Sequence, residues 1–248
     1  MQLLKRSRDH RAEKLRTILL LEADFNMNNK MLGRDAMLSA SRRKVLARDN
    51  YGGRKGHRAA EVSLNSYLTY NSIWGRRGRA VVMSNDAKGC YDRIAHVVLA
   101  LALLRLKIPK TAIQSMLDAI QHMDHYVCTA FGVSEDKCGN DPTRPKPQGV
   151  LQGNGAGPAA WSAIVSALIS VMRKRGYGYK QWSLIKQRMI TLVCFAFVDD
   201  TDLIHSNDDP NVSTAQLIQE AQEALATWEG LIEASGGALA PERATGTW

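Results

Sequence analysis

The order of apolar and polar positions predicts a chain in which short strands and amphipathic helices alternate. Residues 79–86 and 190–197 are short runs rich in apolar and β-branched residues, and each predicts a buried strand. Apolar residues at helical spacing predict five helices, at residues 61–73, 91–108, 111–123, 158–176 and 214–234. Alternation over residues 125–133 predicts a further strand. The pattern is therefore that of an α+β protein.

The second buried strand continues into a hairpin. Residues 198–200 (VDD) predict a tight turn, and residues 201–206 (TDLIHS) predict the returning strand. The order of strand, helices, hairpin, helix and final extended segment is that of a split β-α-β, ferredoxin-like antiparallel sheet with helices on one face. Residues 1–60 are only weakly periodic and predict no particular element.

Positive charge is concentrated at the start of the chain. The net charge is +9, and the first 60 residues hold 15 of the 33 Lys and Arg but only 6 of the 24 Asp and Glu, so the remainder holds 18 of each. A basic segment of this kind favours a polyanionic partner, with nucleic acid the first candidate and an anionic membrane the second.

The sequence also restricts the compartment. No run of about 18 consecutive apolar residues occurs, so we expect no membrane-spanning helix. The charged N-terminal residues lack the apolar core of a signal peptide, and the four cysteines are scattered with no CxxC pair. We therefore expect a protein that is intracellular, in the cytoplasm or nucleus, and not secreted.

Acidic residues stand where the two buried strands end. Asp86 ends the first strand, whereas Asp199 and Asp200 occupy the hairpin turn. If these elements are neighbours in an antiparallel sheet, three carboxylates gather at one edge. Oxygen ligands suit Mg²⁺ or Mn²⁺, and two such ions about 4 Å apart promote phosphoryl transfer. The alternative is that all three are ordinary turn residues, because Asp favours turns.

Four segments resemble the motifs of reverse transcriptases and occur in that family's order. They are motif A (VVMSNDAKGCYDRI, 81–94), motif B (GVLQGNGAGP, 149–158), motif C (FVDD, 197–200) and motif D (ASGGALAPER, 234–243). Residues 15–34 and 51–65 resemble fingers motifs of the retrotransposon and group II intron branch. The resemblance covers about residues 12–245.

The resemblance implies a right-hand polymerase palm with part of the fingers. We expect a fingers-like basic region at residues 1–78 and a palm-like catalytic region, carrying motifs A to D, at residues 79–248. The chain ends about where the palm of the family ends, so we expect the thumb to be absent. A fragment of a mobile-element protein, with the remaining domains of a longer polyprotein missing, fits this expectation.

The resemblance also implies roles for single residues. Asp86, Asp199 and Asp200 would be catalytic and would bind two Mg²⁺ or Mn²⁺ ions, with the Ala87 carbonyl as an additional ligand. Tyr91 stands at the steric-gate position, where a flat ring excludes the ribose 2′-hydroxyl and admits deoxynucleotides. As an alternative, Tyr91 is a core aromatic at a helix start.

Substrate-binding residues follow from the same resemblance. Gln152 and Gly153 would line the pocket of the incoming nucleotide, and Arg16, assisted by Lys14, would bind its triphosphate. Arg243 stands where motif D usually has Lys. Because the pKa of Arg is too high for proton donation, this departure argues against proton delivery by Arg243.

The implied activity is an RNA-templated DNA polymerase that adds deoxynucleotides to a primer 3′-hydroxyl. Its partners would be an RNA template, a DNA or RNA primer and deoxynucleoside triphosphates, with no membrane. Two alternatives stay open: an RNA-dependent RNA polymerase, and a non-catalytic RNA-binding relic of the same fold. Four residues are candidate zinc ligands by type: His122, His125, Cys128 and Cys138. We expect them to be structural residues and not to bind zinc, because their spacing is loose.

Overall fold

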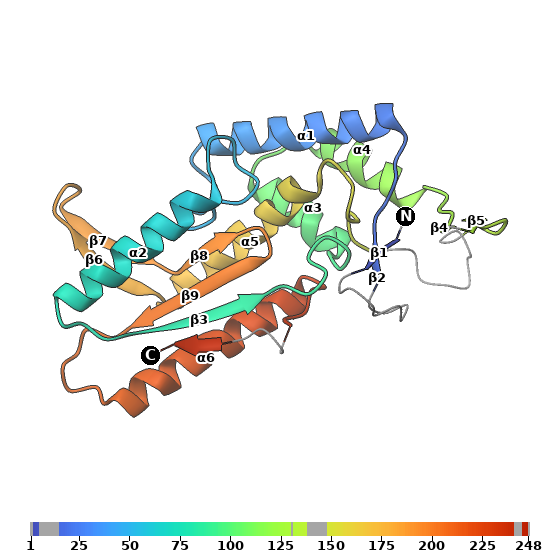
Figure 1. Cartoon of the computed structure of the whole chain (residues 1–248). Coiled ribbons are helices and arrows are strands. Elements are labelled where there is room, and N and C mark those ends of the chain that lie inside the picture. Colours follow the sequence, from blue (N-terminus) through green and yellow to red (C-terminus); the bar gives the residue numbers. More distant parts are fainter. Residues whose placement is uncertain (1, 5–14, 130, 138–147, 241–244, 248) are drawn as a thin grey trace.

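A four-stranded antiparallel sheet forms the centre of the molecule. The structure is a computed structural model that describes residues 2–4, 15–129, 131–137, 148–240 and 245–247 of the 248 (Figure 1). The sheet has the order β10-β3-β9-β8. Its strands are β3 (Ala80–Asp86), β8 (Cys194–Phe197), β9 (Asp200–Ser206) and β10 (Thr245–Thr247). Strand β9 lies between β3 and β8, which confirms the predicted split, ferredoxin-like sheet.

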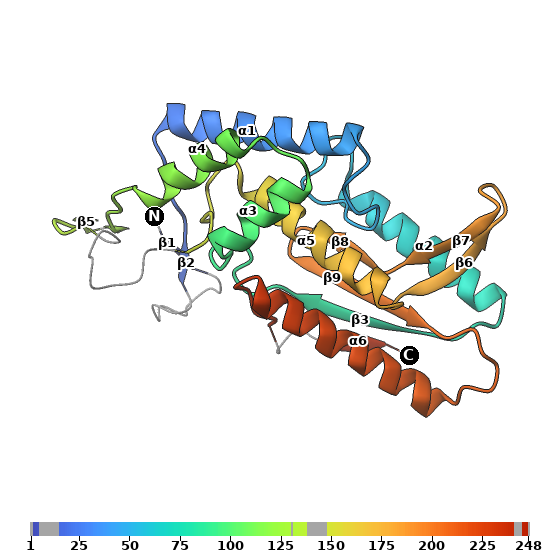
Figure 2. The same cartoon turned by 180° about the vertical axis from the view of Figure 1, so that it is seen from behind.

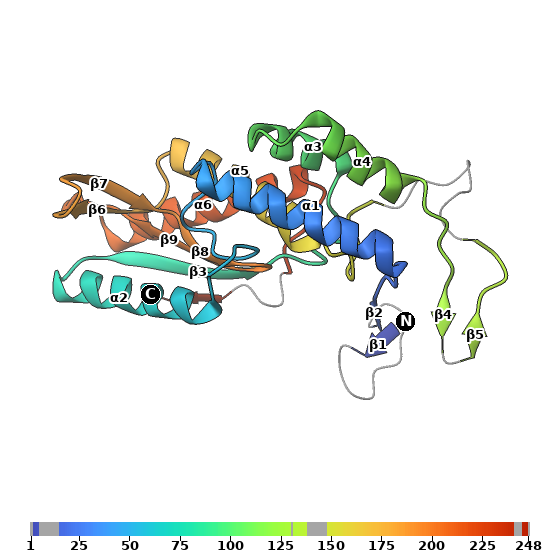
Figure 3. The ribbon, with the colours of Figure 1, turned by 90° about the horizontal axis from the view of Figure 1, so that it is seen from above.

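Helices cover both faces of this sheet, as the view from above shows (Figure 3). Helices α5 (Gly157–Lys174) and α6 (Thr214–Ala234) pack on one face, in a core that includes Met83, Leu203 and Trp228 (Figure 2). The expectation of helices on one face therefore holds for α5 and α6 but not for α2. Helix α2 (Ala59–Gly75) lies on the other face, against Phe195 and Ile204.

A further layer of helices packs against α5. Helix α1 (Ala23–Arg42) crosses the outside of the molecule, and the turn from α3 (His96–Arg105) to α4 (Lys110–Gln121) lies beside it. Sequence periodicity did not predict α1. Its buried positions are Asn29, Gly33, Met37 and Ala40, and this stripe is too narrow and too polar to produce a clear helical pattern.

Two predicted elements are shorter than expected. The helix expected over residues 91–108 begins only at His96, because the Tyr91 carbonyl accepts hydrogen bonds from the motif B loop instead of continuing a helix. The strand expected over residues 125–133 is a small hairpin, with β4 (Cys128–Thr129) and β5 (Gly132–Val133) as its two strands.

The strand expected over residues 190–197 is interrupted at Val193. Its first part, β7 (Arg188–Leu192), pairs with β6 (Tyr179–Ser183) in a separate hairpin that was not predicted. At the N-terminal end, β1 (Gln2–Leu4) pairs with β2 (Leu15–Thr17). Over the part of the chain that the structure describes, no helix is long and apolar enough to cross a membrane.

Candidate active site

Two of the three predicted catalytic aspartates face each other across the central strands. The register of β3 and β9 pairs Asp86 with Asp200, and the Ala87 N–H donates to the Asp199 carbonyl over 3.2 Å. Directly opposed residues project to the same face, with Cβ atoms about 4.5–5.5 Å apart. Asp86 is half-buried and Asp200 is exposed. The predicted proximity of the two acidic segments is therefore confirmed at the level of the backbone.

The turn that carries Asp199 has an unusual backbone. Val198 and Asp199 connect β8 to β9, and Val198 has a φ of 57°. A β-branched residue in this left-handed region is a rare conformation, at a cost of about 1–3 kcal/mol. The indole N–H of Trp161 donates to the Val198 carbonyl and holds the turn from α5.

The segment from Asp49 to Gly53 supports the hairpin from the other side. The Tyr51 N–H donates to the Ala196 carbonyl over 2.9 Å, and the Ala196 N–H donates to the Asp49 carbonyl over 3.0 Å. Gly52 lies directly against the turn, where a Cβ would come within 2.4 Å of the Val198 nitrogen. Only glycine leaves room for the turn at this point.

The Asp49 carboxylate fixes the beginning of β8. It accepts the Val193 N–H over 2.8 Å and the Arg173 guanidinium over 2.7 Å. Burial raises the pKa of Asp49, and the Arg173 charge opposes that rise. The break between β7 and β8 at Val193 thus places a backbone donor on a buried acid, which sequence reasoning did not detect.

Tyr91 lies within electrostatic reach of Asp199 and holds the motif B loop, which contains Gln152 and Gly153. The Tyr91 carbonyl accepts the Val150 N–H over 2.8 Å, and the half-buried Tyr91 ring lies against α5, where a Cβ on Gly157 would be 3.4 Å from it. The Gln152 N–H donates to Asp92 over 3.0 Å. Asp92 therefore braces the motif B loop.

Helix α1 and the segment before it hold the same loop from outside. The Gln152 carbonyl accepts the Leu19 N–H over 2.7 Å. The Asn26 side chain accepts the Gly155 N–H over 2.7 Å and donates to the Gly153 carbonyl over 3.3 Å. Gly153 has a φ of +112°, and a Cβ there would be 2.2 Å from the Leu19 carbonyl oxygen. Sequence reasoning missed Asn26, although its place in a fingers motif was a signal.

Three other predicted residues are only partly placed or lie outside the described residues. Arg16 belongs to β2, where it pairs with Leu3 in the backbone register. Lys14 and Arg243 lie outside the described residues. Asp202, which was not predicted as a ligand, accepts a hydrogen bond from the Ser84 hydroxyl over 2.5 Å.

The electrostatic environment at the strand ends is negative. Burial raises the pKa of the Cys90 thiol to about 12, and the charges of Asp199, Asp92 and Asp86 add to this rise. Burial also raises the pKa of Tyr91, with Cys90 and Asp199 adding to it. A cation at the aspartates would therefore relieve an unfavourable concentration of negative charge.

The donor set at this position fits a hard divalent cation by its chemistry, because carboxylate oxygens are the ligands that Mg²⁺ and Mn²⁺ prefer. The side chains do not form a ready cluster: among the described residues no three His, Cys, Asp or Glu side chains make a metal-binding group. The expectation that His122, His125, Cys128 and Cys138 are structural stays an expectation, and Cys138 lies outside the described residues. The backbone arrangement, together with the negative environment, supports the assignment.

Comparison with solved structures shows the fold to be that of a polymerase. Telomerase from Candida albicans in complex with a TWJ fragment of telomeric RNA is 15% identical, with a TM-score of 0.60 over 88% of this chain and 34% of that chain. Telomerase from Candida tropicalis in complex with the same kind of fragment is 13% identical, with a TM-score of 0.59 over 94% and 38%. The chain thus spans little more than a third of the length of these structures.

Comparison with curated protein sequences gives no match. The family model described as reverse transcriptase (RNA-dependent DNA polymerase) matches residues 4–235. Motifs A, B and C lie within that range, on the strands and loops described above, whereas motif D begins at its end. Because the match covers nearly the whole chain, the protein belongs to the reverse transcriptase family.

Proposed function

We propose that this chain is the catalytic part of an RNA-templated DNA polymerase that extends a primer 3′-hydroxyl with deoxynucleotides. The observation that carries the proposal is the pairing of Asp86 with Asp200 across β3 and β9, with Asp199 next to them on the turn. Two motifs far apart in the sequence thereby meet at one end of the sheet. Members of this family use divalent metal ions.

The metal-binding residues in this proposal are Asp86, Asp199 and Asp200, with the Ala87 carbonyl as an additional ligand. Two Mg²⁺ or Mn²⁺ ions, when bound, supply activation of the hydroxyl nucleophile and stabilisation of the leaving oxygen. The protein contributes the position of these ligands. Gly52, Trp161 and the Asp49 segment hold the Val198–Asp199 turn in one place against β3.

The incoming nucleotide would lie over the motif B loop, at Gln152 and Gly153, next to Tyr91. Arg16 would bind its triphosphate from the fingers-like region at residues 1–78, while residues 79–248 form the palm-like region. The basic N-terminal quarter suits the phosphates of template and primer. An origin in a longer mobile-element polyprotein, with an RNA template and a DNA or RNA primer, belongs to the same proposal.

Primer extension tests the proposed function. The wild-type chain should extend a primer on an RNA template with deoxynucleotides in Mg²⁺ or Mn²⁺, and an Asp199→Asn/Asp200→Asn double variant should not. Extension that survives the double change would refute the two-metal mechanism. If neither protein extends the primer but both bind an RNA–DNA hybrid, a non-catalytic RNA-binding role replaces the enzyme. Equal use of ribonucleotides by the wild type would favour an RNA polymerase.

Tyr91 gives a prediction about sugar selectivity. Its half-buried ring lies against Gly157 beside the motif B loop, so removing the ring opens space where a 2′-hydroxyl would lie. We expect Tyr91→Ala to raise ribonucleotide incorporation relative to deoxynucleotide incorporation about ten-fold or more. A steric clash of about 1–3 kcal/mol corresponds to about 10–200-fold in selectivity. Tyr91→Phe, which keeps the ring, should retain the wild-type ratio. Equal selectivity in all three proteins would show that Tyr91 is a core aromatic only.

A further inference from the structure

A groove whose larger lobe is basic lies at the opposite end of the sheet from the aspartates. Its two neighbouring lobes have volumes of about 360 Å³ and about 560 Å³, and the larger lobe lies between the turn after α2 and the β6–β7 hairpin. The register of β3 and β9 pairs Ala80 with Ser206 at this end and Asp86 with Asp200 at the other. The six residue steps between the two ends correspond to about 20 Å of strand.

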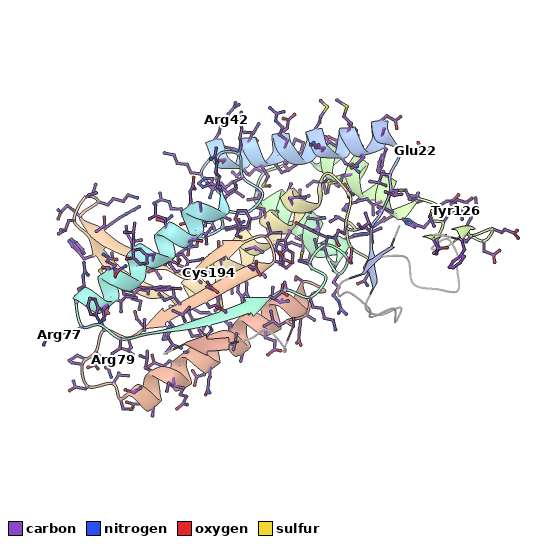
Figure 4. All side chains as sticks on the ribbon, viewed as in Figure 1. Glu22, Arg42, Arg77, Arg79, Tyr126 and Cys194 are labelled. Atoms are coloured by element: carbon purple, nitrogen blue, oxygen red, sulfur yellow. The ribbon has the colours of Figure 1, made fainter. Side chains whose placement is uncertain are left out.

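One wall of the larger lobe is rich in arginine. Arg76, Arg77 and Arg79 line it from the turn between α2 and β3 (Figure 4). The Arg79 guanidinium donates to the Asp209 carbonyl over 3.3 Å, whereas Arg76 and Arg77 are exposed. Among the ion pairs between described residues, none involves these three arginines. The guanidinium groups of Arg76 and Arg77 are therefore available to an anionic partner.

The facing wall carries an aromatic side chain. Trp182 and Met189 are directly opposed in the β6–β7 hairpin, and they are 47% and 50% exposed. Lys180 lies two residues before Trp182 on the same strand face and also lines the groove. An exposed indole across a groove from arginines is the combination that stacks a nucleobase while its phosphates are bound. In the larger lobe the carboxylates of Asp208 and Asp209 offset only part of the positive charge. The smaller lobe also contains Glu220 and Glu223, so the anion-binding part of the groove is the larger lobe.

We propose that this groove binds a single-stranded segment of RNA, with Arg76 and Arg77 on phosphates and Trp182 stacked on a base. The identity of that strand as template rests on the proposed function. At about 3.4 Å per base-pair step, the distance along β3 corresponds to about six steps between the groove and the aspartates. The groove would thus hold the same nucleic acid at a second point and limit its dissociation during extension.

Binding of a fluorescently labelled RNA single strand of about 20 nucleotides, followed by anisotropy across a salt series, tests this proposal. We expect Arg76→Gln/Arg77→Gln to weaken binding about ten-fold and to lower the slope of log K against log salt by about 1.4, because each phosphate that an arginine neutralises contributes about 0.7 to that slope. The matched control is Lys110→Gln/Lys174→Gln, which removes two exposed charges outside the groove. It should leave affinity and slope close to the wild type.

The aromatic contact has its own variants. Trp182→Ala should weaken RNA binding about five-fold or more, because base stacking on an aromatic side chain is a substantial part of single-strand affinity, whereas Trp182→Phe should keep most of it. Equal affinity and slope in Arg76→Gln/Arg77→Gln and its control would overturn the proposal. A second pair of results would also overturn it. In that case Trp182→Ala binds RNA with unchanged affinity, and the arginine variant loses binding to anionic vesicles or an acidic polypeptide as much as it loses binding to RNA. The groove would then be a general anion-binding surface.

The groove and the polymerase proposal fail in different ways. Absence of primer extension by the wild type would refute the proposed function. RNA binding by the groove is measured without catalysis, so it would still be tested. If both proposals hold, the arginine variant should recover its extension rate at saturating template, because its aspartates are unchanged. A rate that stays low at saturation would place the arginines in catalysis instead of RNA retention and would contradict the proposal.

Discussion

Asp86→Asn should abolish primer extension as completely as a change in the hairpin, although Asp86 is far from Asp199 and Asp200 in the sequence. The carboxylate is directly opposite Asp200 in the β3–β9 register, so it would hold the same ions. Metal ions stabilise a phosphoryl-transfer transition state by several kcal/mol, and each step of about 1.36 kcal/mol is about ten-fold in rate. We therefore expect a loss of about 10³-fold, measured by single-turnover extension.

Asp118→Asn is the matched control for this change. Asp118 is exposed on α4, and the same loss of one carboxylate there should leave the rate within about two-fold, as is usual for surface positions away from special features. An Asp86→Asn protein that folds normally and extends primers at the wild-type rate would separate Asp86 from the reaction. The hairpin aspartates would then have to act without a partner on β3.

Gly52→Ala should produce the second large effect, through the shape of the turn and without changing any charge. A Cβ at this position would lie 2.4 Å from the Val198 nitrogen, so the turn or the supporting segment must shift. We expect a loss of about 1–3 kcal/mol in the free energy of unfolding, typical of overpacking. Since a misplacement of about 1 Å can cost about 10²-fold in rate, extension should fall by a similar factor in the fraction that remains folded.

Gly230→Ala distinguishes this packing effect from a general response to glycine substitution. Gly230 lies within α6, and a Cβ there would meet nothing within 4 Å. Replacing a helical glycine by alanine stabilises by about 0.5–1 kcal/mol, so Gly230→Ala should raise the urea midpoint slightly and leave extension unchanged. If Gly52→Ala unfolds at the wild-type urea midpoint and extends primers at the wild-type rate, the turn does not depend on the close approach of Gly52 to Val198.

The elements that position the aspartates were predictable because their patterns are local. Helix α6 has the bounds Thr214–Ala234 that its apolar spacing predicts. Strand β3 is a short apolar run that ends in an acidic residue, β9 is the returning strand of the hairpin, and their antiparallel pairing follows from the split sheet. The family motifs then indicated which acids matter. What these patterns left open was the register, which the structure fixes by opposing Asp86 and Asp200.

The supports of the site were not predictable, since they depend on contacts between distant segments. Asp49 and Val193 are 144 residues apart and interact inside the protein, and no local pattern connects them. Asn26 and the motif B loop are separated by a similar distance in sequence. Helix α1 was missed for a related reason: its buried stripe contains Asn29 and Gly33 instead of an apolar face, and Gly33 lies closely against Ala159 of α5.

In the proposed function, Asp86, Asp199 and Asp200 act as one divalent-metal site. Mn²⁺ binding to this site can be measured, with primer–template present, by the loss of the free-ion EPR signal. We predict that Asp86→Asn and Asp200→Asn each weaken Mn²⁺ binding about ten-fold or more, because affinity depends on the charge of the ligands, whereas Asp118→Asn binds like the wild type. Equal Mn²⁺ affinity in all four proteins would contradict the claim of a shared metal site.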